Sequence, residues 1–546
     1  MSQPHFTILG GGISGLSLAY FLRQRIQANL TSSSNLLSPS NHHQLKKIFD
    51  IKITIIESKP RIGGWIKSNV SNEKHIFERG PRGFRPNGNG VEILRLAEEL
   101  QLSSDAVKTS DASKHRFLYV QGKLQQMPAG LSDLITLPSV LQSAVKGILK
   151  EPLQPKGLWS DETIYSFITR RFGEHVAKNI VGGMVSGIYA GDITKLSMKS
   201  CFPRLWELEN EHGSIIKGVL GGGTSNSKKE PNKDPFQGVI EEDSDFVKSY
   251  SKAAQVSFVH GLEQLINGLE KSLLMNDNIQ IIKDDEVVQL KQLTSNKCKR
   301  DQCQVTLNSG ITIRSDHVFS TIPSKSLANI LRDTTTVSKR AIHMLDQMEA
   351  CDVGVVNMSF SDSNLIAKPG FGYLIPASEG ENVLGVSFDS CIFPEQGKKG
   401  GSDGSDGSDG SDGSDGSDGS DGSDGDNGAG GENNGTVVCV MIGGVNCPNV
   451  IEMSETELLN EAKQSLSKHL NININDINNK LINYKSGVVK DCIPQYNVGH
   501  YDSVVELENI LKGDIPNLTI LGTPFYGVGL ADSVSKAKKI ATSFRV

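Results

Sequence analysis

The sequence predicts an α/β fold with mixed α+β insertions, and three observations carry this prediction. The chain has 546 residues, of which 37% are hydrophobic, so it is long enough for two to four packed domains of roughly 100–200 residues. Strand-like and helix-like patterns alternate along it between polar inserts. At the N-terminus, a short apolar strand, a glycine-rich turn and an apolar helix follow one another over residues 6–22.

The glycine-rich turn predicts a dinucleotide-binding loop. Residues 6–15 read FTILGGGISG and place Gly10, Gly12 and Gly15 at the spacing of that loop. The first glycine permits a tight turn, the second lets backbone approach a pyrophosphate, and the third lets the helix pack on the strand. Glu57 directly follows the next apolar segment, 51–56, at the position where an acid binds the ribose. The usual gap of about 20 residues is exceeded because a polar insert occupies 27–44.

A second glycine signature narrows the nucleotide to FAD. Residues 57–68 read ESKPRIGGWIKS, and residues 77–86 read FERGPRGFRP. Nicotinamide dehydrogenases lack the glycine pair that follows the ribose-binding acid, whereas flavoproteins of the amine-oxidase type have it. The two segments together therefore favour a bound flavin.

The C-terminal region is predicted to complete the same flavin site. Residues 518–530 read LTILGTPFYGVGL, a strand and a glycine turn that lead into a helix. Backbone N–H groups of Val528, Gly529 and Leu530 are candidates for the flavin edge on which charge develops during reduction. Both ends of the chain would then build one discontinuous FAD domain.

Charge and cysteine usage exclude several classes. The net charge is −6, and residues 401–434 carry nine Asp, one Glu and no base, so the rest of the chain is −6 + 10 = +4. A mildly basic body lacks the clustered Lys and Arg of a nucleic-acid-binding protein. The eight cysteines form no CxxC pair, so we expect no metal site and no disulfide scaffold.

Three polar segments are expected to be linkers, namely 27–44, 221–245 and 401–434. The last opens with a Ser-Asp-Gly repeat that buries nothing and repels itself, which predicts a disordered loop. It lies between the strand-like segments 383–390 and 436–443 and is expected to cap their hairpin.

The sequence shows no transmembrane helix. The uncharged segment 6–22 contains the glycine loop and is shorter than the ~20 apolar residues that a bilayer requires. At 131–150, Leu134, Leu137, Leu141, Val145 and Ile148 recur at helical spacing. This amphipathic helix would pack on its own domain or lie on a membrane surface.

Longer strings resemble the protoporphyrinogen oxidase family. Beside the flavin motifs, which monoamine oxidases and phytoene desaturases share, the resemblance rests on RFLYV (116–120), GIYAGDITKLSMKSCFPRL (187–205), GFGYLIP (370–376), VMIGG (440–444) and CIPQY (492–496).

The resemblance implies a two-dinucleotide-binding FAD domain, a substrate domain and a helical membrane-binding domain. We expect FAD-binding parts at 1–100, 251–330 and 485–546, a helical membrane-binding and substrate-lining part at 101–250, and a substrate domain at 331–484. It also implies a homodimer on the mitochondrial inner membrane, peripheral and on the intermembrane-space face, with hand-over of product to ferrochelatase.

The resemblance also assigns site residues. Non-covalent FAD is expected to contact Gly10, Gly11, Gly12, Ile13, Ser14, Gly15, Glu57, Ser58, Trp65, Gly80, Pro81, Arg82, Gly83, Val287, Thr523, Val528, Gly529 and Leu530. The substrate is expected to contact Arg116, Phe371, Leu374 and Met441. Arg116 would clamp a propionate, the alternative being a structural ion pair. Tyr373 is left out, and no catalytic acid or base is assigned.

The implied reaction is the oxidation of protoporphyrinogen IX to protoporphyrin IX in haem biosynthesis. It removes six electrons in three hydride transfers to FAD, with molecular oxygen as acceptor and peroxide as product. Two alternatives stay open: another amine or carotenoid oxidoreductase of the same fold, and a flavin-free, prenyl-protein chaperone-like binding protein.

Overall fold

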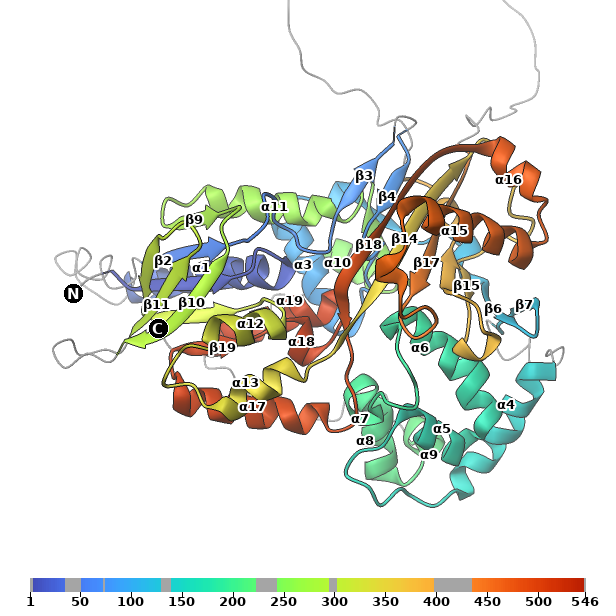
Figure 1. Cartoon of the computed structure of the whole chain (residues 1–546), viewed down its shortest axis with the longest axis horizontal. Coiled ribbons are helices and arrows are strands. Elements are labelled where there is room, and N and C mark those ends of the chain that lie inside the picture. Colours follow the sequence, from blue (N-terminus) through green and yellow to red (C-terminus); the bar gives the residue numbers. More distant parts are fainter. Residues whose placement is uncertain are drawn as a thin grey trace, which may run out of the picture.

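The computed structural model describes residues 3–34, 51–71, 74–128, 139–221, 243–293, 302–396 and 435–544 (Figure 1). The insert predicted at 401–434 lies outside these residues, as do most of the other two inserts and the positions of Leu134 and Leu137 in the predicted amphipathic helix.

A parallel five-stranded sheet forms the core of the left half of Figure 1, in the order β19-β13-β1-β2-β9. Its central strand is the one predicted before the glycine loop. The five strands come from the whole length of the chain: β1 (His5–Leu9), β2 (Lys52–Ile56), β9 (Ile279–Ile282), β13 (His317–Ser320) and β19 (Leu518–Ile520). The two ends of the chain therefore belong to one sheet.

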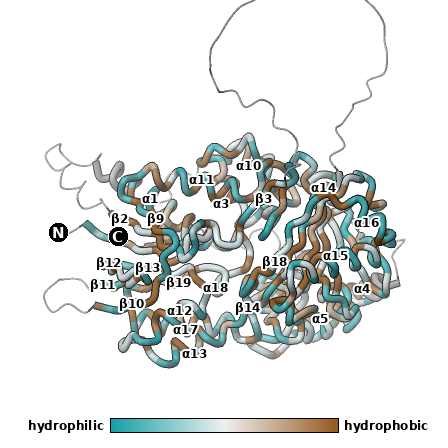
Figure 2. Tube along the Cα trace, turned by 45° about the horizontal axis from the view of Figure 1, so that its top comes forward, coloured by the Kyte–Doolittle hydropathy of each residue, from teal (hydrophilic) through white to brown (hydrophobic). Residues whose placement is uncertain are grey.

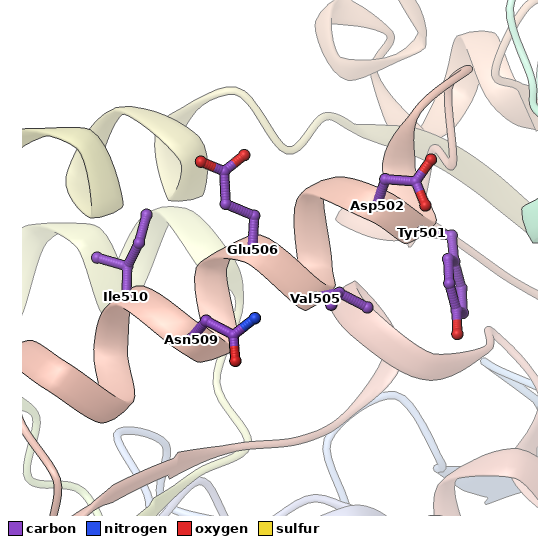
Figure 3. Close-up of a pocket in the computed structure, with 6 residues that line it drawn as sticks. All are labelled: Tyr501, Asp502, Val505, Glu506, Asn509 and Ile510. Atoms are coloured by element: carbon purple, nitrogen blue, oxygen red, sulfur yellow. The ribbon is translucent and has the colours of Figure 1, made fainter. Parts of the chain in front are cut away.

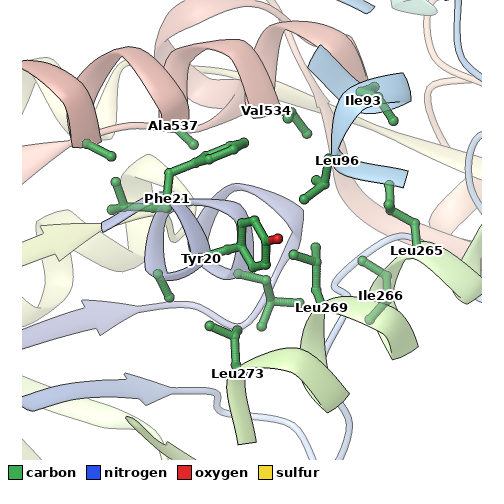
Figure 4. Close-up of a cluster of buried hydrophobic side chains, with 14 of the residues drawn as sticks. Tyr20, Phe21, Ile93, Leu96, Leu265, Ile266, Leu269, Leu273, Val534 and Ala537 are labelled. Carbon is green, nitrogen blue, oxygen red and sulfur yellow. The ribbon is translucent and has the colours of Figure 1, made fainter. Parts of the chain in front are cut away.

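Each face of this sheet is covered by a different layer. Phe6 and Ile8 face a helical layer, whereas the alternate residue Leu9 faces a mixed layer. The helical layer, with a core that includes Tyr20 and Phe21 (Figure 4), contains α1 (Ile13–Ser34), α3 (Val91–Glu99), α11 (Glu263–Leu274) and α19 (Leu530–Ser543). The mixed layer contains an antiparallel sheet of β10 (Val287–Leu293), β11 (Gln302–Leu307) and β12 (Thr312–Ser315), with α12 (Ser324–Leu331), α13 (Lys339–Asp346) and α17 (His500–Asp514).

Helix α1 is longer than the sequence suggested. The polar insert is expected to begin at residue 27, but α1 continues to Ser34. Asn, Thr and Ser are only moderately poor helix formers, so they can extend a helix that tertiary packing has already nucleated.

A seven-stranded sheet forms the second half of the molecule, in the order β18-β14-β17-β16-β15-β6-β7. Only the β15–β6 pair is parallel. The hairpin predicted around the acidic insert is confirmed, since β16 pairs with β17 in antiparallel register. The strands are β6 (Arg116–Val120), β7 (Lys123–Gln126), β14 (Ala350–Phe360), β15 (Gly372–Leu374), β16 (Val383–Ser387), β17 (Thr436–Gly443) and β18 (Leu481–Pro494).

Helices cover both faces of the second sheet. Helix α15 (Glu455–Leu470), with α16 (Ile474–Lys480) beside it, buries one face, and Figure 2 shows hydrophobic strands gathered beside α15. On the other face, α6 (Gly182–Tyr189) approaches closely through two glycines one turn apart. A Cβ on Gly183 would come within 2.9 Å of Leu118 Cδ2, and a Cβ on Gly187 within 2.4 Å of Leu374 Cδ2.

A buried cluster of ion pairs links the helices of residues 139–220. Arg171, whose side chain is 0% exposed, pairs with Glu151 at 3.2 Å and with Glu209, and Glu209 also pairs with Arg170. Its helices are α4 (Ser139–Lys150), α5 (Ile164–Phe172), the π-helical turn η7 (Val176–Val181), α6, α7 (Met198–Cys201), α8 (Pro203–His212) and α9 (Ile215–Leu220). Over the described residues, no helix combines the length and apolarity needed to cross a bilayer.

Several further short elements complete the structure. They are the paired hairpin β3 (Ser68–Val70) and β4 (Ile76–Glu78), the paired strands β5 (Ala106–Lys108) and β8 (Val256–Phe258), and the helices α10 (Asp245–Tyr250), α14 (Asp389–Ile392) and α18 (Thr523–Tyr526).

Two of the expected domain limits fall within structural units. The limit at 485 falls inside β18, which pairs with β14 along its length, and the limit at 331 separates α12 from α13, which share one core with the parallel sheet.

Candidate cofactor and substrate site

The carboxyl ends of the parallel strands bring four sequence-distant positions together. Gly10 follows β1, Glu57 follows β2, Thr321 follows β13 and Gly522 follows β19. Thr321 Oγ1 donates to the carbonyl of Leu9 at 2.8 Å. This edge is where α/β sheets bind nucleotides.

The three glycines of the first loop have different structural roles. A Cβ on Gly15 would lie 2.1 Å from the carbonyl oxygen of Gly10, so only glycine fits there. Gly10 has a positive φ of 101°. A Cβ on Gly12 would meet nothing within 4 Å, so Gly12 borders open space at the start of α1. Space beside a helix N-terminus is suited to a phosphate.

Glu57 and the second loop lie against the first loop. A Glu57 carboxylate oxygen accepts a hydrogen bond from the backbone N–H of Gly11 at 2.9 Å. The N–H of Gly63 donates to the carbonyl of Gly11 at 2.8 Å, and Gly64 approaches the Cα of Gly12. Arg61 holds this turn by donating to the carbonyl of Ile62 at 2.8 Å. The neighbouring Trp65 is 37% exposed.

The C-terminal segment closes the site through Tyr496. Its hydroxyl donates to the carbonyl of Thr523 and accepts from the N–H of Gly527 at 2.8 Å. Gly522, just before α18, lies near Ser14 and Thr321 of the loop edge. Val528 and Gly529 lead directly into α19, whose first residue is Leu530. The strand-turn-helix expectation for this region missed the short helix α18.

Residues 80–83 form the link between the two halves. A Cβ on Gly80 would lie 2.4 Å from the carbonyl of Trp65, so this turn packs on the second glycine loop. Arg82 Nε donates to Asp389 of α14 at 2.9 and 3.0 Å. Both side chains are nearly buried. The Arg82 side chain is therefore directed at Asp389, which leaves the backbone of this turn as its contribution to a cofactor.

Three of the four predicted substrate residues lie in one band across the second sheet. Leu374 pairs with Gly385, and Gly385 pairs with Met441, so the two large side chains flank a glycine on one face. Arg116 is the first residue of β6 and pairs with Gly372. Its guanidinium carbon is 5.2 Å from the ring centre of Phe371. Within the described residues Arg116 has no carboxylate partner, so the alternative of a structural ion pair has no support there.

Comparisons with known proteins agree with this geometry. The family model of flavin containing amine oxidoreductases matches residues 13–539. The chain belongs to that family. It is 30% identical to the protoporphyrinogen oxidase of Homo sapiens, over 98% of this chain and 97% of that protein. It is 23% identical to the coproporphyrinogen III oxidase of Bacillus subtilis, over 98% and 97% respectively. A structure from Exiguobacterium sp. 255-15, provisionally assigned as a protoporphyrinogen oxidase, matches all of this chain and 99% of that one, with a TM-score of 0.70 and 18% identity.

The protein is thus an FAD-dependent oxidoreductase of the porphyrinogen oxidase group, and its fold is the mixed α/β fold of the FAD-dependent amine oxidases. The residues present fit the FAD that the family implies. Gly12 borders open space, Glu57 is anchored beside it, and the buried hydroxyl of Ser533 in the first turn of α19 has no partner. Val287 begins β10 and is buried in the same core as Leu9 and Ile56. Two residues before it, the N–H of Asp285 donates to the carbonyl of Glu57.

Tyr373 lies on the other face of the sheet from Leu374. Its hydroxyl is 3.1 Å from Nδ1 of His469 in α15, and Tyr373 is 1% exposed. Burial raises the pKa of the Tyr373 phenol well above its ordinary value. Its omission from the substrate residues is consistent with this orientation.

Sequence reasoning missed Thr321 and Tyr496. Tyr496 lies in the CIPQY string, which carried the resemblance but no assigned role. Thr321 had no motif around it, and only the position after a parallel strand could have indicated it.

A hollow of about 570 Å³ on α17 is separate from this machinery. All six residues that line it come from that one helix, as Figure 3 shows: Tyr501, Asp502, Val505, Glu506, Asn509 and Ile510. A site formed by one helix face lacks converging groups from a second element, so we assign it no role.

Proposed function

We propose that the protein oxidises protoporphyrinogen IX to protoporphyrin IX in haem biosynthesis, with molecular oxygen as the final acceptor. The observation that carries the proposal is that Leu374, which packs against Gly187 of α6, and Met441 share one face of the sheet, with the unpaired cation of Arg116 at its edge. A flat apolar macrocycle with propionates is complementary to such a surface.

Arg116 would bind a propionate of the substrate. A guanidinium can hold a carboxylate through two parallel hydrogen bonds. The ring of Phe371 lies against this guanidinium and limits its orientations. The macrocycle would then lie on Leu374 and Met441, and its methylene bridges would reach the cofactor in turn.

FAD, when bound, would supply the two-electron acceptor for each of three successive oxidations. The protein's part is positioning and exclusion of water. Cys351 and Cys492 pack near Met441, and burial raises the pKa of both thiols to about 12. They are therefore neutral at physiological pH and supply no general base, and we assign none.

The experiment is a substitution of Arg116 in the FAD-loaded enzyme. We expect R116A to lower kcat/KM for protoporphyrinogen by about 10- to 100-fold, chiefly through KM, because a hydrogen bond to a charged group contributes about 1.5–3 kcal/mol. The matched control is Lys123→Ala, an exposed cation on the adjacent strand β7. Bound flavin should be unchanged in both variants. Full activity of R116A would refute the clamp.

Coproporphyrinogen is the second candidate substrate, because a relative that acts on it matches the whole chain. Protoporphyrinogen, coproporphyrinogen, an amine and a polyene should be compared under air. A preference for any of the last three would replace the proposal. A preparation that stays colourless when supplied with FAD would indicate the flavin-free binding protein instead.

We also propose a peripheral location on a membrane, as a homodimer on the intermembrane-space face of the mitochondrial inner membrane, with product passed to ferrochelatase. The support is the end of α4 and the segment that follows it, where Leu149, Leu153, Leu158 and Trp159 are 73–96% exposed. Exposed apolar side chains of this size in one segment mark interaction surfaces. Flotation with liposomes should be lost in a L149E/W159E variant, and unchanged flotation would refute the contact.

A further inference from the structure

A cavity of about 190 Å³ lies where the β3–β4 hairpin meets the second sheet. The β3–β4 hairpin and the residues that flank it contribute Lys67, Asn69 and Arg79, and the second sheet contributes residues of β14 and β18. Its lining is Lys67, Asn69, Arg79, Val355, Asn357, Lys485, Ser486, Gly487 and Val488. Val355 pairs with Met441, so the cavity lies beside the proposed substrate face, but none of its nine lining residues is among those expected to contact flavin or substrate.

The cavity is strongly positive. Three of the nine lining residues, Lys67, Arg79 and Lys485, are cations, and none is an acid. Across the described part of the chain, no carboxylate pairs with any of these three side chains. Lys67 is half-buried, whereas Arg79 and Lys485 are exposed at the rim, so no carboxylate of the described residues competes with an anion for these three side chains.

The strand register brings the cations together. The N–H of Arg79 donates to the carbonyl of Lys67, which places these two residues opposite each other on the hairpin. Like charges directly opposite in a ladder are unfavourable. Lys485 pairs with Asn357 across β14 and β18 and adds a third charge. An anion bound between the three cations would offset their mutual repulsion, because each cation would be attracted to it.

The wall of the cavity also holds an unsatisfied polar group. Asn357 is 2% exposed. Its amide nitrogen donates to the carbonyl of Glu78 at 3.0 Å, whereas its buried amide oxygen has no hydrogen-bond partner. An unmet buried acceptor is costly, so a ligand that carries an O–H donor beside its negative oxygens suits this wall. Hydrogen phosphate has that combination.

We propose that this cavity is a binding site for a small phosphate-type dianion, held by Lys67, Arg79 and Lys485. The volume of about 190 Å³ is below the 300–1,000 Å³ of pockets for drug-sized ligands, so a tetrapyrrole does not fit. A carboxylate of a larger molecule shares the oxyanion chemistry, and the experiment separates the two sources. The proposal does not depend on which substrate the enzyme oxidises.

The experiment is calorimetric titration of the FAD-loaded enzyme with inorganic phosphate at fixed ionic strength. We expect saturable binding of one phosphate per chain. R79Q and K485Q should each weaken it about tenfold or more, since each removes a charge-assisted hydrogen bond. Lys490→Gln is the matched control, because Lys490 lies on the same strand, is exposed and is not part of the lining. It should bind phosphate like the wild type.

A second variant blocks the cavity without changing its charge. A Cβ on Gly487 would meet nothing within 4 Å, and its φ is not positive, so G487V should fold and fill the space. We expect it to abolish phosphate binding. Absence of saturable binding in the wild type would overturn the proposal, as would equal binding in R79Q and G487V or an equal loss in K490Q.

Steady-state kinetics separate the two anion sources. The porphyrinogen KM of R79Q and G487V should equal that of the wild type. A KM that rises in both variants, together with no phosphate binding in the wild type, would assign the cavity to a substrate carboxylate and overturn the phosphate site.

Discussion

The proposed cofactor half of the site is built chiefly from backbone, whereas the proposed substrate half is built from side chains. Around Gly10, Gly15 and Gly80 the chain approaches itself so closely that a Cβ would lie within 2.5 Å of another heavy atom. On the second sheet, the strand register decides that Leu374 and Met441 share a face and that Tyr373 does not. A side chain added at one of these glycines should disrupt the loop and its flavin binding altogether. A substitution on the second sheet should instead lower substrate affinity by an amount that depends on the group removed.

The largest expected effect comes from the backbone half. Gly15→Ala places a Cβ against the Gly10 carbonyl and should abolish flavin binding, read from the flavin absorbance of the purified protein. Gly513→Ala in α17, where a Cβ meets nothing, is the control and should retain full flavin. Gly12→Ala tests the same loop at a glycine that borders open space. The flavin-free variant should keep its stability, whereas its affinity for FAD should fall. A yellow, active G15A protein would contradict this account.

The next effect concerns the Arg82–Asp389 pair that joins the two halves. D389N leaves a nearly buried guanidinium without its counter-charge and should destabilise the protein by about 3–5 kcal/mol. Chemical denaturation measures this loss. The control D346N disturbs the more exposed Arg332–Asp346 pair and should cost less than about 1 kcal/mol. Similar losses in both variants would show that the Arg82 pair has no special role.

A pH dependence of stability should follow from Glu78, the last residue of β4, whose carboxylate accepts from the N–H of Leu262 at 2.8 Å. Burial raises the pKa of Glu78 from 4.5 to about 7. The folded protein therefore holds a proton that the unfolded chain has lost, and stability from this group falls as the pH rises from 4.5 through 7. The full loss corresponds to about 3 kcal/mol.

The Glu78→Gln variant tests this dependence. Its stability relative to the wild type should increase between pH 5 and pH 8, as measured by urea denaturation at each pH. The control E98Q, at an exposed position of α3, should show a difference that does not vary with pH. A constant difference for E78Q would contradict a raised pKa.

The smallest effect compares neighbours on one strand. Y373F removes the buried contact with His469 and should cost about 1 kcal/mol of stability with kcat/KM unchanged. L374A, on the other face, should lower kcat/KM with flavin retained. If Y373F lowers kcat/KM as much as L374A does, the assignment of the two faces is wrong.

Much of the cofactor half could be predicted from the sequence because glycine spacing reports backbone requirements directly. The loop at Gly10–Gly15, the acid at Glu57 and the second glycine pair all lie where the motifs predicted. Arg82 was less predictable, since its partner Asp389 is 307 residues away. Thr321 and Tyr496 were missed for the same reason, because their roles depend on partners far along the chain.

The sequence by itself determined the parallel dinucleotide fold, the two glycine loops and the family, because these depend on local backbone geometry and on strings of adjacent residues. Only the tertiary structure decided which face of the second sheet carries Leu374 and Met441, which charges lie buried in pairs, and which three cations share a cavity. These features arise from strand register and from contacts across hundreds of residues, which no local pattern encodes.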